Sequence, residues 1–263
     1  MRISCIIPTC NRNDFLVEAI NSVLDQSMPP DEILVINNGS DGVNLPDNIL
    51  QKINVYDLVP FAGVSQARNF GASIAKSDYL AFLDDDDLWC NYYLEKASTA
   101  IKNGAECVVS RLDKMENRKI TNYKNIDNKL NIDNLLVLNP GVNGSNIVIS
   151  KKLFYKIGGF DVKLLTGEDK ALLIEIIKLG ENIKTLSDNQ AILRVHSKGR
   201  LSGAKTISEG IFQFTRKYRD LMSKKIYIFN LLKMYKYRID SGEKSLILKY
   251  LFLKIIYLML SVF

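Results

Sequence analysis

Cysteine is scarce in this chain of 263 residues, and its four copies are scattered. No two of them form a Cys-x-x-Cys pair, so the sequence predicts neither a disulfide framework nor a structural zinc site. The first residues, MRISCIIPTC, hold only a short apolar run that Pro8 ends, which argues against a signal peptide. These absences fit a reducing compartment, and we expect a cytoplasmic protein.

Low-complexity segments and internal repeats are also missing. The chain is 47% hydrophobic and 24% charged, close to the average of globular proteins, which excludes disorder, collagen-like repeats and a polytopic membrane protein. The net charge of +6 comes from one end of the chain. Residues 216–263 carry 11 basic and 3 acidic side chains, and the remainder has a balance of −2. A basic segment of this kind indicates nucleic acid or an anionic membrane.

The N-terminal half alternates between short apolar runs and segments with helical spacing. Strands are predicted at residues 3–7, 32–36, 53–58 and 79–83, and helices at residues 15–24, 64–75 and 89–102. Asn13 is the expected N-cap of the first helix. This alternation predicts an α/β fold with a mostly parallel, Rossmann-like sheet flanked by helices. Such sheets bind ligands at the carboxyl ends of their strands, where polar clusters follow three of the predicted strands.

The second half is harder to interpret. Residues 108–138 are rich in Asn, Lys and Asp and give no clear pattern. Order resumes at residues 143–149, followed by a helix at residues 168–179 and a last strand at residues 191–196. After residue 202 the pattern is helical to the end of the chain.

The most informative feature is the run FLDDDDLW at residues 82–89. Adjacent carboxylates repel one another by about 1 kcal/mol per pair in water at contact distance. A divalent cation would relieve that repulsion, and Mg²⁺ and Mn²⁺ prefer carboxylate and phosphate oxygens. The alternative is a solvated acidic turn before a helix. The position of the acidic run at the end of a predicted strand favours the cation site.

Three further features carry less information alone. The segment GVSQARNFG at residues 63–71 opens a helix, which favours an anion, and Arg68 offers a planar donor. Glu168 and Asp169 begin another helix, either as partners of the helix dipole or as a general base that the helix start keeps ionised. His196, the only histidine, is either structural or part of a metal or phosphate site.

Taken in order, these segments resemble glycosyltransferase family 2, whose members have the GT-A fold. The resemblance covers residues 1–200 and rests on IIPTCNR (6–12), EILVINNGS (32–40), GVSQARNFG (63–71), LDDDD (83–87), IGGFD (157–161), GED (167–169) and RVH (194–196). It implies an inverting, metal-dependent hexosyl- or related transferase that moves a sugar from a nucleotide-diphosphate sugar to an acceptor hydroxyl. It also implies a catalytic domain at 1–200, with a nucleotide-sugar-binding part (1–105) and an acceptor-side part (106–200), and a helical tail at 201–263.

The resemblance also assigns roles to residues. Asp169 is similar to the family's catalytic base, with Glu168 as the second candidate. Asp86 and His196 are the expected ligands of Mg²⁺ or Mn²⁺. The remaining positions are expected to bind the nucleotide sugar, with Asp84 nearer the ribose: Pro8, Thr9, Asn11, Asn37, Asn38, Arg68, Asp84 and Asp85.

One position departs from the family pattern. Asn37-Asn38-Gly39-Ser40 stands where Asp-Asp-Gly-Ser is usual. An asparagine carbonyl accepts a hydrogen bond from the uracil imide as an aspartate does, but without charge. A UDP-sugar remains the favoured donor, and a dTDP- or GDP-sugar stays open.

Two other classes of function are alternatives. A non-catalytic GT-A-like module that binds a nucleotide or a partner is the main alternative, although such a module has no need of a base at Asp169. A nucleotidyltransferase is disfavoured because residues 8–12 contain no glycine for a phosphate loop.

The tail indicates a membrane surface. Residues 245–263 read SLILKYLFLKIIYLMLSVF, which is amphipathic as a helix and holds two lysines that make spanning costly. We expect it to lie in the interface, with Lys224, Lys225, Lys233, Lys236 and Arg238 meeting anionic head groups. Nucleic acid is disfavoured by the long aliphatic runs.

Attachment to a membrane suits a lipid-linked saccharide acceptor in bacterial surface polysaccharide synthesis, with the enzyme peripheral at the inner face of the membrane. Packing on the catalytic domain or in an oligomer is the alternative.

Overall fold

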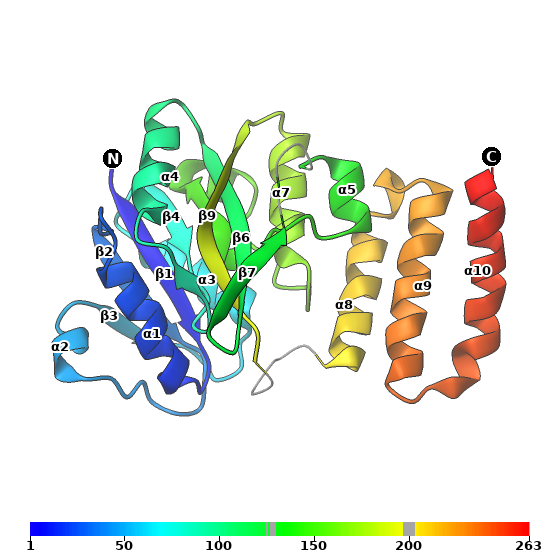
Figure 1. Cartoon of the computed structure of the whole chain (residues 1–263), viewed down its shortest axis with the longest axis horizontal. Helices are drawn as coiled ribbons and strands as arrows, with labels where there is room; N and C mark the ends of the chain where they lie inside the picture. Colours follow the sequence, from blue (N-terminus) through cyan, green and yellow to red (C-terminus); the bar gives the residue numbers. More distant parts are fainter. Residues whose placement is uncertain (125, 127–129, 197–202, 263) are drawn as a thin grey trace.

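The computed structural model describes residues 1–124, 126, 130–196 and 203–262, and everything below concerns these residues. An α/β part built on a sheet lies on one side, and the C-terminal helices α8, α9 and α10 stand beside it in sequence order (Figure 1). The predicted boundary between a catalytic domain and a tail, at residue 200, falls outside the described residues.

Nine described strands form one sheet, in the order β3-β2-β1-β4-β8-β6-β9-β5 with β7 paired to β6. The strands are β1 (Ile3–Thr9), β2 (Glu32–Asn37), β3 (Asn54–Asp57), β4 (Tyr79–Phe82), β5 (Leu88–Trp89), β6 (Cys107–Glu116), β7 (Lys119–Lys124), β8 (Ile147–Ser150) and β9 (Ile183–Arg194). Strands β3, β2, β1 and β4 are parallel, as the alternating sequence predicts. Their carboxyl ends therefore meet at one edge of the sheet.

The helices are α1 (Asn13–Leu24), α2 (Asp47–Leu50), α3 (Val64–Ile74), α4 (Tyr93–Lys102), α5 (Ile132–Val137), α6 (Lys151–Lys156), α7 (Glu168–Lys178), α8 (Ala204–Lys217), α9 (Lys224–Asp240) and α10 (Ile247–Val262). Helices α1 and α4 cover one face of the sheet and helices α3, α6 and α7 cover the other, because successive strand residues point to opposite sides. Cys5 and Ile7 of β1 pack with α1 and α4 in one core. Ile6, between them, packs with α3, α6 and α7 in the other.

Two local predictions are wrong. Asn13 is not an N-cap, because α1 already begins there, and its amide instead holds the loop at Gly42 and Asn44. Trp89 is not helical: it lies in β5, paired antiparallel with Ala191 of β9, and the helix begins at Tyr93. Pairing with a strand distant in sequence overrides the helical spacing of residues 89–92.

The segment without a clear pattern contains the strand that joins the two halves of the sheet. Residues 107–109 of β6 pair antiparallel with β8, and β6 is also parallel to β9 and antiparallel to β7. The short helix α5 follows, capped by Asn131, whose side chain accepts a hydrogen bond from the Asn134 amide. The sequence pattern of this hairpin is unclear because most of β7 and the end of β6 are exposed and carry polar residues.

The C-terminal helices pack on one another and on α5. Asn230 of α9 donates to the Leu136 carbonyl at 2.9 Å, and the Lys233 ammonium donates to the Val137 carbonyl at 2.5 Å. The expectation that Lys233 meets lipid head groups is therefore wrong, because its charged end is held on α5. Burial, together with Lys170, lowers the pKa of Lys233 to about 7. Within the described residues, none of the helices has the length and apolar character needed to cross a membrane.

Gly71 provides a test of how closely α3 lies on the sheet. A Cβ added there would lie 2.5 Å from Ile6 Cγ2 and 3.2 Å from Ile36 Cγ1. Alanine is the better helix former by about 1 kcal/mol, but overpacking a rigid core costs about 1–3 kcal/mol. We expect Gly71→Ala to lower the free energy of unfolding by about 1 kcal/mol, measured by urea denaturation. Gly42→Ala, with no atom within 4 Å of the added Cβ, is the neutral control. Equal stability of both variants would contradict this close packing.

Candidate active site

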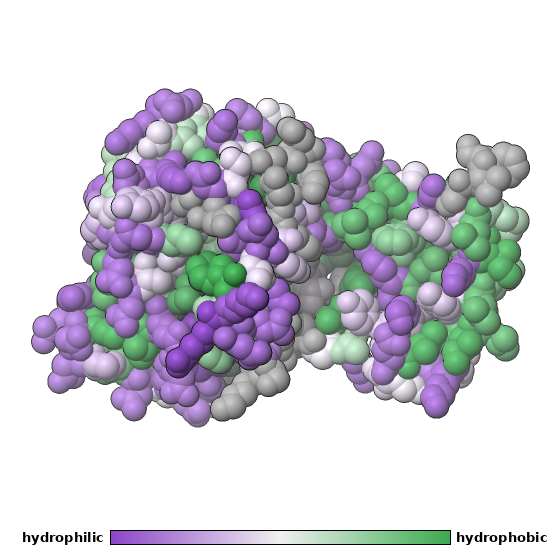
Figure 2. Space-filling model, viewed as in Figure 1, coloured by the Kyte–Doolittle hydropathy of each residue, from purple (hydrophilic) through white to green (hydrophobic). Residues whose placement is uncertain are grey.

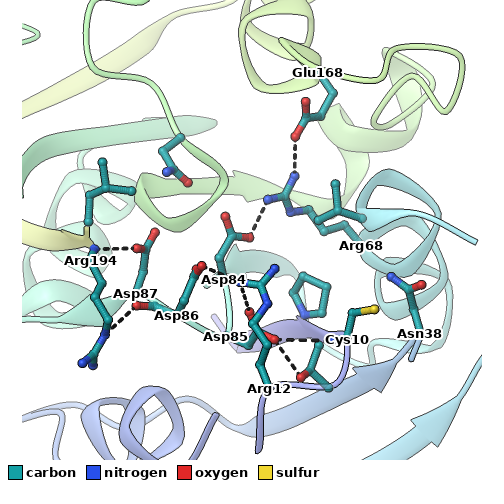
Figure 3. Close-up of a pocket in the computed structure, with 15 residues that line it drawn as sticks. Cys10, Arg12, Asn38, Arg68, Asp84, Asp85, Asp86, Asp87, Glu168 and Arg194 are labelled. Carbon is teal, nitrogen blue, oxygen red and sulfur yellow. Dashed lines mark hydrogen bonds and ion pairs between the residues drawn. The ribbon is translucent and has the colours of Figure 1, made fainter. Parts of the chain in front are cut away.

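A cleft of about 260 Å³ opens where the loops after β1, β2 and β4 converge, at the carboxyl ends of the parallel strands (Figure 3). It is lined by Pro8, Thr9, Cys10, Arg12, Asn38, Val64, Arg68, Asp84, Asp85, Asp86, Asp87, Asn143, Glu168, Leu193 and Arg194. Charged groups of both signs therefore face one cavity, as the sequence predicts for a single site at this edge.

Arg68 joins two sides of the cleft. Its guanidinium donates to Asp84 at 2.5 Å and to Glu168 at 3.0 Å, and the side chain is only 2% exposed (Figure 3). Burial alone would lower the pKa of Arg68, but the two carboxylates raise it above its usual value. The cation is thus permanently charged, and its Nε is buried without a hydrogen-bond partner among the described residues.

Two neighbouring segments hold Arg68 in place. Asn69 binds the backbone of Phe160 through both ends of its amide, at 2.8 and 2.9 Å. The Phe160 ring then lies 5.0 Å from the guanidinium carbon, a cation–π contact. On the other side Gly144 gives room, since a Cβ there would lie 2.3 Å from the Arg68 Nη2. Phe160 of the IGGFD segment and Gly144 thus both pack around one arginine.

Asp85 anchors the loop after β1. Its buried carboxylate accepts hydrogen bonds from the Thr9 hydroxyl at 2.8 Å and the Cys10 amide at 3.3 Å, and Arg12 lies 3.2 Å away. Burial raises the pKa of Asp85 to about 7, although Arg12 opposes the shift. Asp85 therefore fixes the shape of the Thr9–Arg12 loop rather than standing free in the cleft.

The Asp86 carboxylate contacts an arginine and a histidine. Arg12 Nη1 is 2.5 Å and His196 Nε2 is 2.9 Å from the same oxygen, Asp86 Oδ2. Arg194 donates to the Asp86 carbonyl at 3.0 Å. His196 Nδ1 is buried and has no partner in the part of the chain that the structure describes. The structure thus brings the two predicted metal ligands together.

Asp87 is a buried structural residue. It accepts hydrogen bonds from the Ser145 hydroxyl at 2.6 Å and the Arg194 amide at 3.0 Å. Burial, with Asp86 and Asp84 nearby, raises the pKa of Asp87 well above its usual value. Ser145 Oγ also accepts from the Asp84 amide at 3.0 Å, so one serine orients both ends of the acidic run.

The asparagines after β1 and β2 mainly shape the loops. Asn11, with a left-handed φ of 55°, donates to the Ser40 hydroxyl and accepts from the Asp41 amide. Asn37 is buried and binds Gly39, Asp41 and Asp57. Neither residue is among those that line the cleft, whereas Asn38, Pro8 and Thr9 line it.

Glu168 and Asp169, at the start of α7, share one cavity, but only Glu168 also lines the cleft. Glu168 lines the cleft and pairs with Arg68. Asp169 lines a second cavity of about 200 Å³ beside Lys170 and Lys233, and accepts the Lys170 amide at 2.7 Å. The expectation that the helix start keeps Asp169 ionised is wrong: burial and Glu168 raise its pKa to about 7. Loss of solvent and a neighbouring like charge outweigh the helix dipole.

The acidic run fits a divalent cation. One oxygen each of Asp84, Asp86 and Asp87 lies within 4.8 Å of the others. Asp87 is already hydrogen-bonded, whereas Asp84 and Asp86 are the more exposed members, with 24% and 19% of their side chains open. Hard oxygen donors on one side of an open cleft, with the His196 ring in contact with Asp86, suit Mg²⁺ or Mn²⁺.

Sequence reasoning missed Arg12, Arg194 and Ser145. Arg12 lies in the first motif, and its charge was the available signal, since four carboxylates need cations nearby. Arg194 was visible only as part of the RVH segment. Ser145 gave no signal, because its role depends on β8 lying beside β4, a pairing that the sequence did not predict.

A sequence model of the family described as glycosyl transferase family 2 matches residues 4–158. An uncharacterized glycosyltransferase of Rickettsia felis is 28% identical over 231 residues, which cover 78% of this chain and 36% of that protein. The putative teichuronic acid biosynthesis glycosyltransferase TuaG of Bacillus subtilis is 35% identical over 99 residues, or 36% of this chain and 39% of TuaG. The chain thus spans about a third of the length of the Rickettsia felis relative.

Solved structures support the fold. The S. aureus TarS fragment 1–349 in complex with UDP-GlcNAc matches with a TM-score of 0.65 and 18% identity, over 90% of this chain and 73% of that one. At this identity the likeness shows the fold alone, and it confirms the predicted GT-A architecture. Because the matched family segment spans more than half of the 263 residues, the chain belongs to glycosyltransferase family 2.

Proposed function

We propose that this glycosyltransferase moves a sugar from a nucleotide-diphosphate sugar, preferably a UDP-sugar, to the hydroxyl of a saccharide acceptor, with inversion. The observation that carries the proposal is the ion-paired bridge from Asp84 through Arg68 to Glu168 across the cleft. It connects the acidic run to the helix that bears Asp169. TarS, which shares the fold, has been crystallised with UDP-GlcNAc and with UDP.

The donor would lie along the strand ends. Pro8, Thr9 and Asn38 line the cleft, where we assign the nucleoside, with Asn11 and Asn37 holding the loops around it. Arg68 is suited to a phosphate or ribose oxygen, because its charge is fixed and its Nε is unpartnered. We assign Asp84 to the ribose side and Asp85 to the support of the first loop.

We propose that Asp86 and His196 hold Mg²⁺ or Mn²⁺ at the diphosphate, within the acidic run. When bound, such a cation stabilises negative charge on the leaving nucleotide. Arg12, 2.5 Å from Asp86, keeps that carboxylate oriented and compensated in the free protein. The Nε2 of His196 contacts the same oxygen of Asp86 that Arg12 does.

Asp169 is the better candidate for the base. Glu168 is engaged by Arg68 at 3.0 Å, which stabilises its charge and weakens it as a proton acceptor. Asp169 lines the adjoining cavity and has no ion pair with Arg68, and its pKa of about 7 is close to the pH at which a general base works best. In the proposed reaction Asp169 takes the proton of the acceptor hydroxyl as the oxygen attacks the anomeric carbon.

We further propose a role in surface polysaccharide synthesis at a membrane, where the acceptor is lipid-linked. Helix α10 supports attachment, because its outer face exposes Leu248 (80%), Phe252 (63%) and Ile255 (57%). Apolar residues gather over this end of the molecule (Figure 2). Lys224, Lys225 and Lys254 are exposed and supply positive charge for anionic head groups.

Removal of divalent metal tests the first assignment. We expect EDTA to abolish transfer from a nucleotide sugar and added Mg²⁺ or Mn²⁺ to restore it. Asp86→Ala should lower turnover by about 100-fold or more, because charge on the leaving group is then less stabilised. Circular dichroism checks that the variant is folded. Full activity in EDTA would contradict the metal assignment.

The pH profile tests the base. A raised carboxyl pKa means that Asp169 is protonated, and inactive, below about pH 7. We therefore expect kcat to rise with pH through about 7 and Asp169→Asn to lower it by about 100-fold or more while the nucleotide still binds. Glu168→Gln should move the midpoint to lower pH, since Glu168 raises the Asp169 pKa. Unchanged turnover in Asp169→Asn, with an inactive Glu168→Gln, would identify Glu168 as the base.

Co-sedimentation with anionic liposomes tests membrane attachment on the full chain. A triple variant of α10, Leu248→Ser, Phe252→Ser and Ile255→Ser, should lose binding, because it removes the exposed apolar face. Raising the salt concentration should weaken binding of the unaltered protein. The exposed Ile120→Ser on β7 is the control. If the triple variant sediments as the unaltered protein does, the apolar face of α10 serves another purpose.

A further inference from the structure

A groove of about 500 Å³ runs beside the cleft and is not used by any role assigned above. One wall comes from the segment between β3 and α3 and from the start of α3, and includes Phe61 and Ser65. The other comes from the segment before α7, with Val162, Leu165 and Thr166. Thr206 of α8 also lines the groove.

The groove meets both catalytic cavities. It shares Val64 and Glu168 with the cleft. It shares Thr166 and Glu168 with the cavity that contains Asp169. A molecule in the groove therefore lies next to both the cleft and the cavity that contains Asp169, which is where an acceptor is needed.

The walls of the groove are held firmly. Phe61 has a φ of 61°, an unusual conformation for a bulky residue, and its amide donates to the Asn38 carbonyl at 2.7 Å. Such strain persists only where the surrounding structure imposes it, and the ring is left 67% exposed. On the other wall, the Leu165 amide donates to the Gln213 side chain of α8 at 2.9 Å.

The groove also contains a polar group without a partner. Ser65 is 5% exposed, and its Oγ has no hydrogen-bond partner among the described residues. Thr166 adds a hydroxyl on the facing wall. Apolar surfaces with a few polar groups between them suit a sugar ring, which has apolar C–H faces and a rim of hydroxyls. A lipid chain would leave these hydroxyls unused.

We propose that this groove binds the acceptor, that its occupant is a saccharide ring seated between Phe61 and Leu165, and that Phe61 determines acceptor preference. The inference rests on the proposed transfer reaction and adds the acceptor's place and chemical class to it. The helix α8 belongs to the same site because it supports the Leu165 wall.

The test uses the full chain saturated with UDP and Mg²⁺, so that the donor site is occupied. Saturation-transfer NMR with methyl glycosides of neutral hexoses and N-acetylhexosamines should show binding through the ring C–H protons of at least one probe. Phe61→Ser and Leu165→Ser should each weaken that binding at least fivefold and leave UDP affinity unchanged. Both side chains are exposed, so the fold should tolerate the changes. Ile120→Ser is the matched control, also exposed and apolar but distant on β7.

The outcomes separate the two proposals. A protein that fails to bind UDP contradicts the proposed function. A protein that binds UDP and none of the glycosides overturns the groove assignment. Glycoside binding that neither wall variant alters overturns it as well, and so does a loss of UDP affinity in Phe61→Ser, which would place Phe61 on the donor.

Discussion

The buried guanidinium of Arg68 constrains the rest of the site. A charge that is 2% exposed is costly unless opposite charges and hydrogen bonds compensate it. Asp84 and Glu168 provide that compensation from two segments 84 residues apart, the end of β4 and the start of α7. The position of α7, and of Asp169 on it, is thereby tied to the acidic run. The two ion pairs of Arg68 thus fix the separation between the two sides of the cleft.

Several small residues serve this arrangement by occupying little space. Gly144 leaves room for the guanidinium, Gly71 lets α3 approach Ile6, and Gly39 lets the second loop approach Asn11, whose Oδ1 would lie 2.0 Å from an added Cβ. Each of these glycines lies at a contact between segments that are distant in sequence. Their purpose is close approach, and no left-handed backbone is needed at these three positions.

The sequence predicted the parallel half of the fold well, because its strands and helices follow one another and each carries its own periodicity. It also predicted that the polar clusters after those strands meet at one site, although it missed the contributions of Arg12, Arg194 and Ser145. It failed where a residue's state depends on a distant partner. Trp89 looked helical but pairs with β9, and β6 had no clear pattern although it joins the two halves of the sheet. Lys233 looked like a surface charge until its ammonium was found on the Val137 carbonyl.

The hydrogen bonds from α9 to α5 limit how the C-terminal helices can be exchanged between related chains. Asn230 and Lys233 complete the carbonyl end of α5, and Ile228 and Leu232 are buried alongside. The C-terminal helices are therefore no interchangeable appendage. A recombinant that joins this α/β part to the helices of a relative keeps the donors to the Leu136 and Val137 carbonyls only if the new helices carry groups equivalent to Asn230 and Lys233. Helices α5 and α9 therefore depend on each other across the junction between the sheet and the C-terminal helices.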